Sequence, residues 1–435
     1  MIPFVSPEPV ADFSQDTWWI WLIKAVAILV FLILSVLMAL WVERRGLGRI
    51  QTRPGPNVIG PFGLFQAVAD ALKLILKEDF WLKGADKVLY LLAPIISAFA
   101  AFMVYAVIPF GPNVSMFGIN TPLQLADMSV GVLYILAVTG FGVYGMVLGG
   151  WSARSTFSLL GGVRSSAQLI SYELSMGLAL VTVFIVSGSM STSSIVAAQA
   201  GQWWVVALFP AFVIYFFSIM GEVNRVPFDL PEAEGEIVAG PMTEYSSMKF
   251  AWYYLAEYIN MLNVSAVGTT LFLGGWLAPW PLNQINDGML NTGWWPILWF
   301  LAKVWLVMFV FIWIRGTLLR VRYDQLMKLG WMVLIPAGLV WLVAVAVVQG
   351  IMNFTEIQQS TLLIAIAIAF GVVILLLLLW PERKVTQIEE PEAEFDAYAG
   401  GYPVPPMPGE QLQPSARRRR REAVLAMSAE EATDE

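Results

Sequence analysis

The sequence predicts an all-α polytopic membrane protein with about nine transmembrane helices and an amphipathic helix on the cytoplasmic surface. Of its 435 residues, 58% are hydrophobic and only 13% are charged, whereas about 25% of the residues of a soluble domain are charged. Apolar runs of about 20 residues recur along the chain, and each is long enough to span a bilayer. The basic residues gather in alternate connections between these runs, which is the pattern of a multi-pass membrane protein.

The apolar runs define nine candidate spans. Each can cross a hydrocarbon core of about 30 Å, and several begin or end on Trp, which is typical of the lipid–water interface. We expect an eight-span core over residues 18–350 and a ninth span within residues 351–381. The candidate spans are Trp18–Trp41, Val88–Phe110, Met128–Leu148, Ala167–Val186, Trp203–Met220, Trp252–Leu273, Trp295–Ile314, Trp331–Val348 and Leu362–Trp380.

The orientation follows from the basic residues. All but two of the 25 Lys and Arg lie in connections that follow odd-numbered spans or in the tail; the exceptions, Lys24 and Lys303, lie within spans. The positive-inside rule makes these connections cytoplasmic. Residues 1–17 are then an external segment. Residues 382–435 are a cytoplasmic tail, and their Pro, Glu and Arg content predicts disorder.

The chain contains no Cys and no His. It therefore offers no disulfide, no ligand for an Fe–S cluster and no haem-binding His. A zinc site would lack both of its usual ligand types, so we expect no metal site. Any proton transfer through this chain has to rely on carboxylates, with help from Lys, Tyr and water.

Three charged residues fall inside predicted spans: Glu173, Glu257 and Lys303. A charge at the centre of a membrane helix costs about 2.5–3.5 kcal/mol on insertion scales, so such residues usually face a polar interior. Each of the three is either a functional group or a structural charge that is paired or reaches an interface. We expect Lys24 to be structural.

The third cytoplasmic connection is strongly acidic. Carboxylates about 7 Å apart repel by about 2.4 kcal/mol at an effective dielectric constant near 20, so such a group would hold protons near neutral pH. A solvated acidic loop is the alternative interpretation. Around the single Arg225, this segment carries Glu222, Asp229, Glu232, Glu234, Glu236 and Glu244.

The first cytoplasmic connection combines arginines, a turn and an amphipathic segment. Gly55 lies between two prolines, which indicates a fixed turn. Apolar residues from Leu64 to Leu76 then recur at helical spacing, with Asp70 and Lys73 on the opposite face. This pattern predicts a helix on the cytoplasmic membrane surface. It could frame the mouth of a cavity or simply anchor the loop.

Several of these segments resemble one family. The chain is similar to the quinone-channel membrane subunit of respiratory complex I, the NADH:quinone oxidoreductase, in the same order over roughly residues 18–350. The ninth span and the tail extend beyond the eight-span core of that family. The segments that carry the resemblance are Glu43–Glu78, Ser171–Glu173, Glu222–Glu236, Ala256–Tyr258 and Arg322–Gln325.

The resemblance implies a membrane subunit of a proton-pumping NADH:quinone oxidoreductase in a prokaryotic plasma membrane. It implies that quinone is the substrate, and that NADH, FMN and Fe–S clusters are bound by partner subunits of the peripheral and membrane arms. Lipid is a further expected partner, and nucleic acid is not. The implied quinone-binding residues are Glu43, Arg44, Arg45, Arg53, Asp70 and Arg225. The implied residues of the carboxylate relay that couples quinone reduction to proton translocation are Glu173, Glu222, Glu232, Glu234, Glu236, Glu244 and Glu257.

Two other functions remain open at this point. A membrane subunit of a related hydrogenase complex would keep some of these carboxylates, although the segment Arg53–Asn57 favours complex I. A secondary transporter would also bury carboxylates, but it usually shows inverted repeats and broken helices, which the sequence does not show. A bare scaffold would not need glutamates inside its spans.

Overall fold

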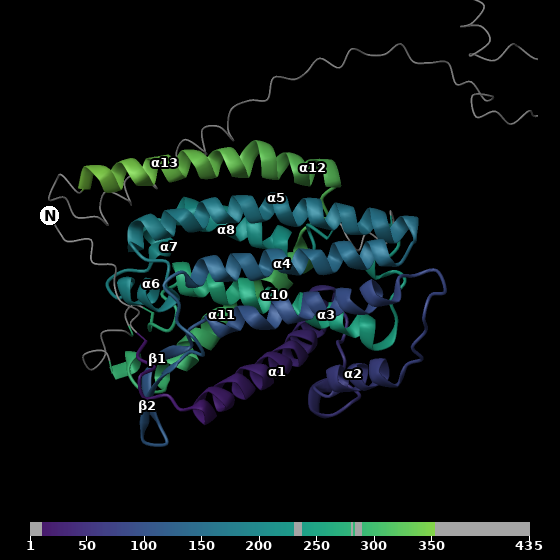
Figure 1. Cartoon of the computed structure of the whole chain (residues 1–435), viewed down its shortest axis with the longest axis horizontal. Helices are drawn as coiled ribbons and strands as arrows, with labels where there is room; N and C mark the ends of the chain where they lie inside the picture. The colour runs from purple at the N-terminus through teal and green to yellow at the C-terminus, as the bar shows by residue number, and fades with distance from the viewer. Residues whose placement is uncertain (1–10, 230–236, 280–281, 283–288, 353–435) are drawn as a thin grey trace, which may run out of the picture. The chain divides into compact units, whose positions relative to one another are not determined.

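Long apolar helices dominate the computed structural model, which describes residues 11–229, 237–279, 282 and 289–352 (Figure 1). All of these residues belong to one unit, Met1–Val373. Within this described part, six helical segments are long and apolar enough to cross a membrane. They are α1 (Trp18–Ile50), α3 with a following turn (Lys87–Ala106), α4 (Gly131–Ser152), α5 (Thr156–Ser187), α11 (Trp295–Thr317) and the continuous segment Tyr323–Met352, which comprises α12 (Tyr323–Lys328), a π-helical turn (Leu329–Leu334) and α13 (Ile335–Met352).

The other three predicted spans are not among these six. The fifth forms two helices, α7 (Trp204–Ala207) and α8 (Phe209–Glu222), because Pro210 begins a new helix and cannot continue the first one. The sixth is α10 (Ser247–Phe272), whose length of 26 residues suffices but whose polar side chains make it less apolar. The ninth, Leu362–Trp380, lies outside the described residues. The count of nine spans therefore stays a prediction.

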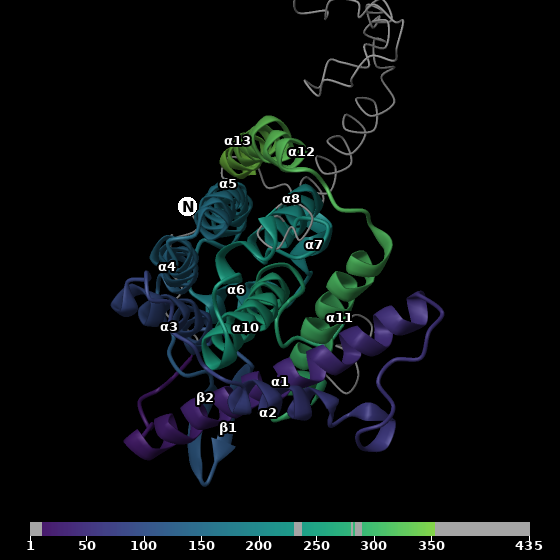
Figure 2. The same ribbon diagram turned by 90° about the vertical axis from the view of Figure 1, so that its right-hand side faces the viewer.

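The helices pack in an ordered stack. α13 packs on α5, α5 on α4 and α4 on α3, and Figure 2 shows these helices one above another in end-on view. Beside the stack, α10 contacts both α3 and α11, and α1 contacts α11. Every residue of α10 from Met261 to Phe272 is buried, as expected of a helix that is surrounded by others.

Close approach of α4 to its neighbours depends on glycine. A Cβ at Gly145 would lie 2.8 Å from the backbone oxygen of Ala93 in α3, and one at Gly150 would lie 2.6 Å from the backbone oxygen of Ser158 in α5. Small residues allow such contacts between membrane helices, where packing rather than water drives association. This tight stack places α4 and α5 close enough to enclose a cavity between them and α10.

A short β-hairpin, which the sequence analysis did not predict, accompanies the helices. Strands β1 (Gly111–Met116) and β2 (Ile119–Leu123) pair antiparallel between α3 and α4. Phe117 and Gly118 form the turn, with φ values of 52° and 85°, and positive φ at both central residues is typical of a type I′ hairpin turn. The signal for this turn in the sequence is weak, because the chain has Phe-Gly where a two-residue hairpin turn usually has Asn-Gly or Asp-Gly.

The predicted amphipathic helix is present as α2 (Gln66–Leu76). Its apolar residues Leu72, Ile75 and Leu76 are exposed, which suits a helix lying on a membrane surface. The remaining short elements are α6 (Thr192–Ala198) and the 3-10 turns Pro61–Gly63 and Gly240–Met242.

Candidate functional site

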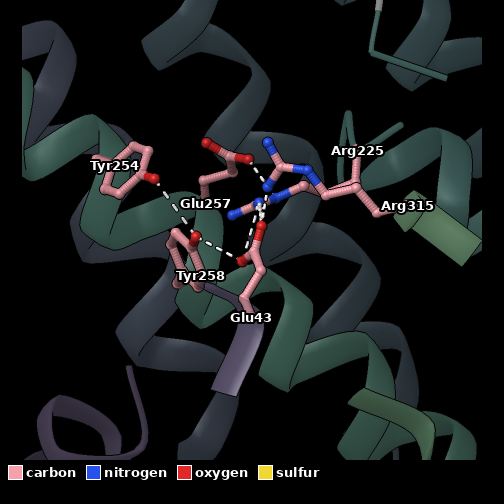
Figure 3. A network of polar contacts seen from close by, with 6 residues as sticks. All are labelled: Glu43, Arg225, Tyr254, Glu257, Tyr258 and Arg315. Carbon is pink, nitrogen blue, oxygen red and sulfur yellow. Dashed lines mark hydrogen bonds and ion pairs between the residues drawn. The ribbon is translucent and has the colours of Figure 1, made fainter. Parts of the chain in front are cut away.

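A buried network of charged side chains forms around Arg225 (Figure 3). The Arg225 Nε lies 2.5 Å from Oε1 of Glu257, and Nη1 lies 3.1 Å from Oε1 of Glu43. Arg315 also donates to Oε1 of Glu43, and the Tyr258 hydroxyl donates to Oε2 of Glu43 at 2.6 Å. One arginine therefore bridges two carboxylates, and one of these carboxylates accepts from three donors.

Four separate parts of the chain supply this network. Glu43 comes from α1, Glu257 and Tyr258 come from α10, and Arg315 comes from the last turn of α11. Arg225 lies in the loop after α8. The buried Gln168 of α5 shapes that loop, because its amide donates to the backbone oxygens of Gly221 and Phe228 at 2.7 and 2.8 Å.

The charges of the network are balanced, and all but that of Arg315 are well buried. Glu43 is 4% exposed and Arg225 is 7% exposed, so each charge needs its partner to offset the cost of leaving water. The guanidinium of Arg225 also lies 4.2 Å from the centre of the Tyr258 ring. Burial by itself lowers the pKa of Arg225, but the charge of Glu257 and the contact with Tyr258 outweigh it and raise that pKa. Arg225 therefore stays positively charged.

A polar cavity adjoins the network. Three carboxylates line it, those of Glu173, Glu222 and Glu257, together with Asn224 and Asn260. Its volume of about 50 Å³ is enough for water, which needs about 10–15 Å³. Among the described residues, Oε2 of Glu222 is buried without a hydrogen-bond partner. The cavity can therefore hold water that links these carboxylates.

A second ion pair lies at the surface beside the network. Arg44 pairs with Asp70 of α2, and the Gln66 amide donates to the same carboxylate at 3.2 Å. Arg44 follows Glu43 directly in α1, yet 45% of the Arg44 side chain is exposed. Adjacent residues of α1 therefore connect the amphipathic helix on one side with the buried network on the other.

Comparison with known proteins places these residues in a family. Residues 23–346 match the family model described as NADH dehydrogenase. The chain belongs to the NADH dehydrogenase family. It is also 52% identical to an NADH-quinone oxidoreductase subunit of Streptomyces avermitilis over 440 aligned residues, which cover 98% of this chain and 96% of that relative. The matched region contains the whole network and the cavity, and it confirms the resemblance seen in the sequence.

In this member of the NADH dehydrogenase family, the structure brings many of the predicted residues together. Glu43, Arg225 and Glu257 form one network, and Glu173 and Glu222 line the adjoining cavity. Neither the contacts nor the family match tests the roles expected for these residues. Their functions in quinone binding or proton transfer stay predictions.

Other predicted residues lie elsewhere. Arg53 is exposed, and Arg45 packs against the rings of Trp41 and Phe62. The backbone oxygen of Glu244 accepts from Tyr90 at 2.5 Å within a separate aromatic cluster. Glu232, Glu234 and Glu236 lie outside the described residues.

Two members of the network had no predicted role. Arg315 looks in the sequence like any basic residue that follows a span, and nothing there indicates its contact with Glu43. Tyr258 follows Glu257 within a segment that carries the family resemblance, which was a signal for proximity to the site but not for a hydrogen bond to α1.

The two lysines inside spans have structural partners. The Lys303 ammonium donates to the backbone oxygens of Leu273, Gly275 and Leu277 at 2.6, 2.9 and 2.6 Å. Lys24 pairs with Asp16 at 2.7 Å. These contacts favour the structural interpretation of both lysines.

Proposed function

We propose that this chain is the membrane subunit of a proton-translocating NADH:quinone oxidoreductase, in which quinone is reduced beside the network and carboxylates relay the resulting charge change. The membership of the chain in the NADH dehydrogenase family supports this function. The observation that carries the proposal is the shared position of Arg225 between Glu43 and Glu257. It links a carboxylate near the surface helix α2 with a carboxylate that lines the water-sized cavity.

The quinone side of the site is the cytoplasmic end of α1 with α2. Here Arg44 and Asp70 form a half-exposed pair next to Glu43, and the exposed apolar face of α2 suits the membrane surface from which a hydrophobic quinone would arrive. NADH oxidation, FMN and the Fe–S clusters belong to partner subunits in this proposal. Electrons reach quinone from those partners, and quinone takes up two electrons and two protons to become quinol.

The relay would begin with a shift of Arg225 between its two carboxylate partners, Glu43 and Glu257. Two unit charges 4 Å apart interact by about 4 kcal/mol at an effective dielectric constant of 20. If reduction draws Arg225 toward Glu43, Glu257 loses an attraction of this size and is favoured to take up a proton from the cavity. Glu222 and Glu173 line the same cavity and can pass protons onward through water. Reduction of quinone is thereby tied to proton movement in the membrane.

The test uses Glu222→Gln and Glu257→Gln in the intact complex. Each amide keeps the shape of the side chain and removes its titration. We expect both variants to oxidise NADH with a soluble artificial acceptor at the normal rate, while quinone-linked turnover and proton pumping into proteoliposomes fall at least about tenfold, since proton-transfer groups typically contribute about 10²–10⁴-fold. Glu78→Gln, at an exposed carboxylate after α2, is the matched control and should behave as the unmodified complex.

Normal quinone reduction with a normal proton gradient in both variants would reject the relay. Deletion of the chain tests the broader assignment, because membranes without it should lose NADH-driven quinone reduction. Loss of a hydrogen-linked activity instead would identify a hydrogenase complex.

A further inference from the structure

An open pocket lies on the surface of α1 and α11, apart from the cavity of the carboxylates. Its volume is about 410 Å³, and its lining includes Trp41, Arg45, Arg49, Phe62 and Phe309. It shares no lining residue with the cavity that contains Glu222. The positive-inside orientation predicted from the sequence places these arginines at the cytoplasmic face of the membrane.

The pocket carries two positive charges, and no carboxylate is among the described residues that line it. Arg45 and Arg49 are one helical turn apart on the same side of α1. Within the part of the chain that the structure describes, neither forms an ion pair, whereas Arg44, Arg225 and Arg315 all do. A ligand with a negative charge would therefore meet two arginines whose charges are not yet balanced.

Aromatic residues hold Arg45 in place. Its guanidinium lies 5.3 Å from the centre of the Trp41 ring and 5.1 Å from that of Phe62. Its Nη1 donates to the backbone oxygen of Phe62 at 3.1 Å, and the indole of Trp41 donates to the same oxygen at 3.0 Å. These contacts leave the remaining N–H donors of the fork available to oxygen atoms of a ligand.

The rest of the pocket is apolar and continues onto exposed helix surface. Phe309 is 57% exposed, and Leu306 lies one turn before it on α11 with 61% exposed. On α1, Leu34 and Met38 are exposed in the same way toward the middle of the helix. Arginines at one end and aliphatic side chains at the other match a molecule with an anionic head and hydrocarbon chains.

We propose that this pocket binds the phosphate group of an anionic membrane phospholipid, with Arg45 and Arg49 on the phosphate and the acyl chains along α1 and α11. Basic pockets between membrane helices at the cytoplasmic side favour anionic lipid headgroups. An uncharged quinone gives these two arginines no anion to pair with, so Arg45 has a different role here from the one that the family resemblance implied. The lipid site does not depend on the proposed function.

The test measures lipid binding to the purified intact complex by native mass spectrometry. The probes are phosphatidylglycerol and phosphatidylcholine with identical acyl chains. Each arginine near an anionic lipid is worth about fivefold in affinity. We therefore expect Arg49→Gln to bind phosphatidylglycerol about fivefold more weakly and the double variant with Arg45→Gln about 25-fold more weakly. Arg320→Gln, which removes an exposed arginine from the loop after α11, should bind as the unmodified complex does.

Several outcomes would overturn the proposal. Equal binding of phosphatidylglycerol by the double variant and the unmodified complex is one, and an equal loss in Arg320→Gln is another. Displacement of the lipid by inorganic phosphate alone would show a soluble anion site. A crosslink from a photoreactive residue at position 49 to an acidic segment of a partner subunit, in place of lipid, would show a protein interface.

A second variant covers the case in which the double variant does not assemble. Arg45→Lys with Arg49→Lys keeps both charges and should retain the preference for phosphatidylglycerol. Loss of that preference would also contradict the site.

Discussion

Arg225 contacts two carboxylates from different helices, and this geometry depends on the shape of its side chain. Its Nε faces Glu257 and its Nη1 faces Glu43. A guanidinium presents several donors in a rigid planar fork, whereas a lysine ammonium is a single point of charge on a flexible stem. A lysine at this position would keep the positive charge, but its single nitrogen could not reproduce the separate contacts of Nε and Nη1 with the two carboxylates.

The variant Arg225→Lys keeps the positive charge but loses the two-sided contact, so it tests the two contributions separately. The subunit should still assemble, because one positive charge remains in the buried network. Quinone-linked turnover should fall at least about tenfold, which corresponds to about 1.4 kcal/mol, while NADH oxidation with a soluble acceptor stays normal. Both rates can be measured in the same membrane preparation. Wild-type quinone turnover in this variant would show that the bridge is only structural.

Lys303 provides a contrasting case, because among the described residues its buried charge contacts backbone oxygens and no carboxylate. Its ammonium satisfies three backbone oxygens near the end of α10. Lys303→Met would leave these oxygens unpaired, and each unsatisfied buried group costs about 1–3 kcal/mol. We expect a lower unfolding temperature of the purified complex, with unchanged quinone turnover per assembled complex. Reduced turnover at normal thermal stability would instead assign Lys303 to the reaction.

At the scale of helices, the packing of α4 on α5 positions Glu173. Gly140 of α4 faces this carboxylate, and a Cβ at Gly140 would lie 3.0 Å from its Oε1. Such a contact is tighter than ordinary van der Waals contact, so Glu173 has to move when the glycine is replaced. The absence of a side chain at one position of α4 therefore sets where a carboxylate of α5 can lie.

Gly140→Ala is expected to reduce proton pumping, since it displaces Glu173 within the cavity. Gly177→Ala is the matched control in α5, because nothing lies within 4 Å of a Cβ at that position. Alanine favours a helix over glycine by about 1 kcal/mol, so the control should be neutral or stabilising. Proton uptake into proteoliposomes decides the outcome. Equal behaviour of both variants would mean that the position of Glu173 does not limit pumping.

The amphipathic helix α2 is held by contacts with both α1 and α10. Asp70 pairs with Arg44 of α1, and the Ser247 hydroxyl of α10 donates to the backbone oxygen of Leu74 at 3.0 Å. Just beyond the helix, Asp79 pairs with Lys249 of α10 at 2.9 Å. The helices that carry Glu43 and Glu257 thus both contact the same surface helix.

Asp70→Leu should weaken quinone reduction while NADH oxidation by a soluble acceptor continues. The Arg44–Asp70 pair is partly exposed, so its loss should cost no more than about 1 kcal/mol of stability. The change in activity would then come from a displaced α2 rather than from unfolding. Lys73→Leu adds the same apolar side chain at an exposed position of α2 and is the control. A parallel loss of both activities in an assembled complex would contradict a role at the quinone entrance.

At the scale of the whole molecule, the one-sided distribution of Lys and Arg predicts the topology. A tag inserted at the exposed hairpin turn between Phe117 and Gly118, or in the connection near Asp287, should be accessible only from outside the cell. A tag after Arg421 should be accessible only from inside. Labelling of intact and permeabilised cells with an impermeant reagent tests both sides. A tail labelled from outside would contradict the nine-span topology.

Much of the architecture could be predicted from the sequence, because it depends on local composition. Apolar runs of sufficient length gave the positions of α1, α3, α4, α5, α11 and α13, and helical periodicity gave α2. The hairpin β1–β2 was missed, since a short strand pair held by a two-residue turn leaves little pattern in the sequence. The break at Pro210 was foreseen only as a kink, although the structure ends one helix and starts another there.

The sequence by itself determined the class of protein, the family resemblance and the residue types available for chemistry. Without Cys or His, carboxylates, arginines and tyrosines have to form the site. Only the tertiary structure decided which of them meet: Glu43 and Arg315 are 272 positions apart in sequence and share one ion pair. The physical reason is that a buried carboxylate needs an opposite charge and hydrogen-bond donors beside it to offset the cost of leaving water. That pairing depends on how α1, α10, α11 and the loop after α8 pack together. The sequence of any one of these segments does not determine that packing.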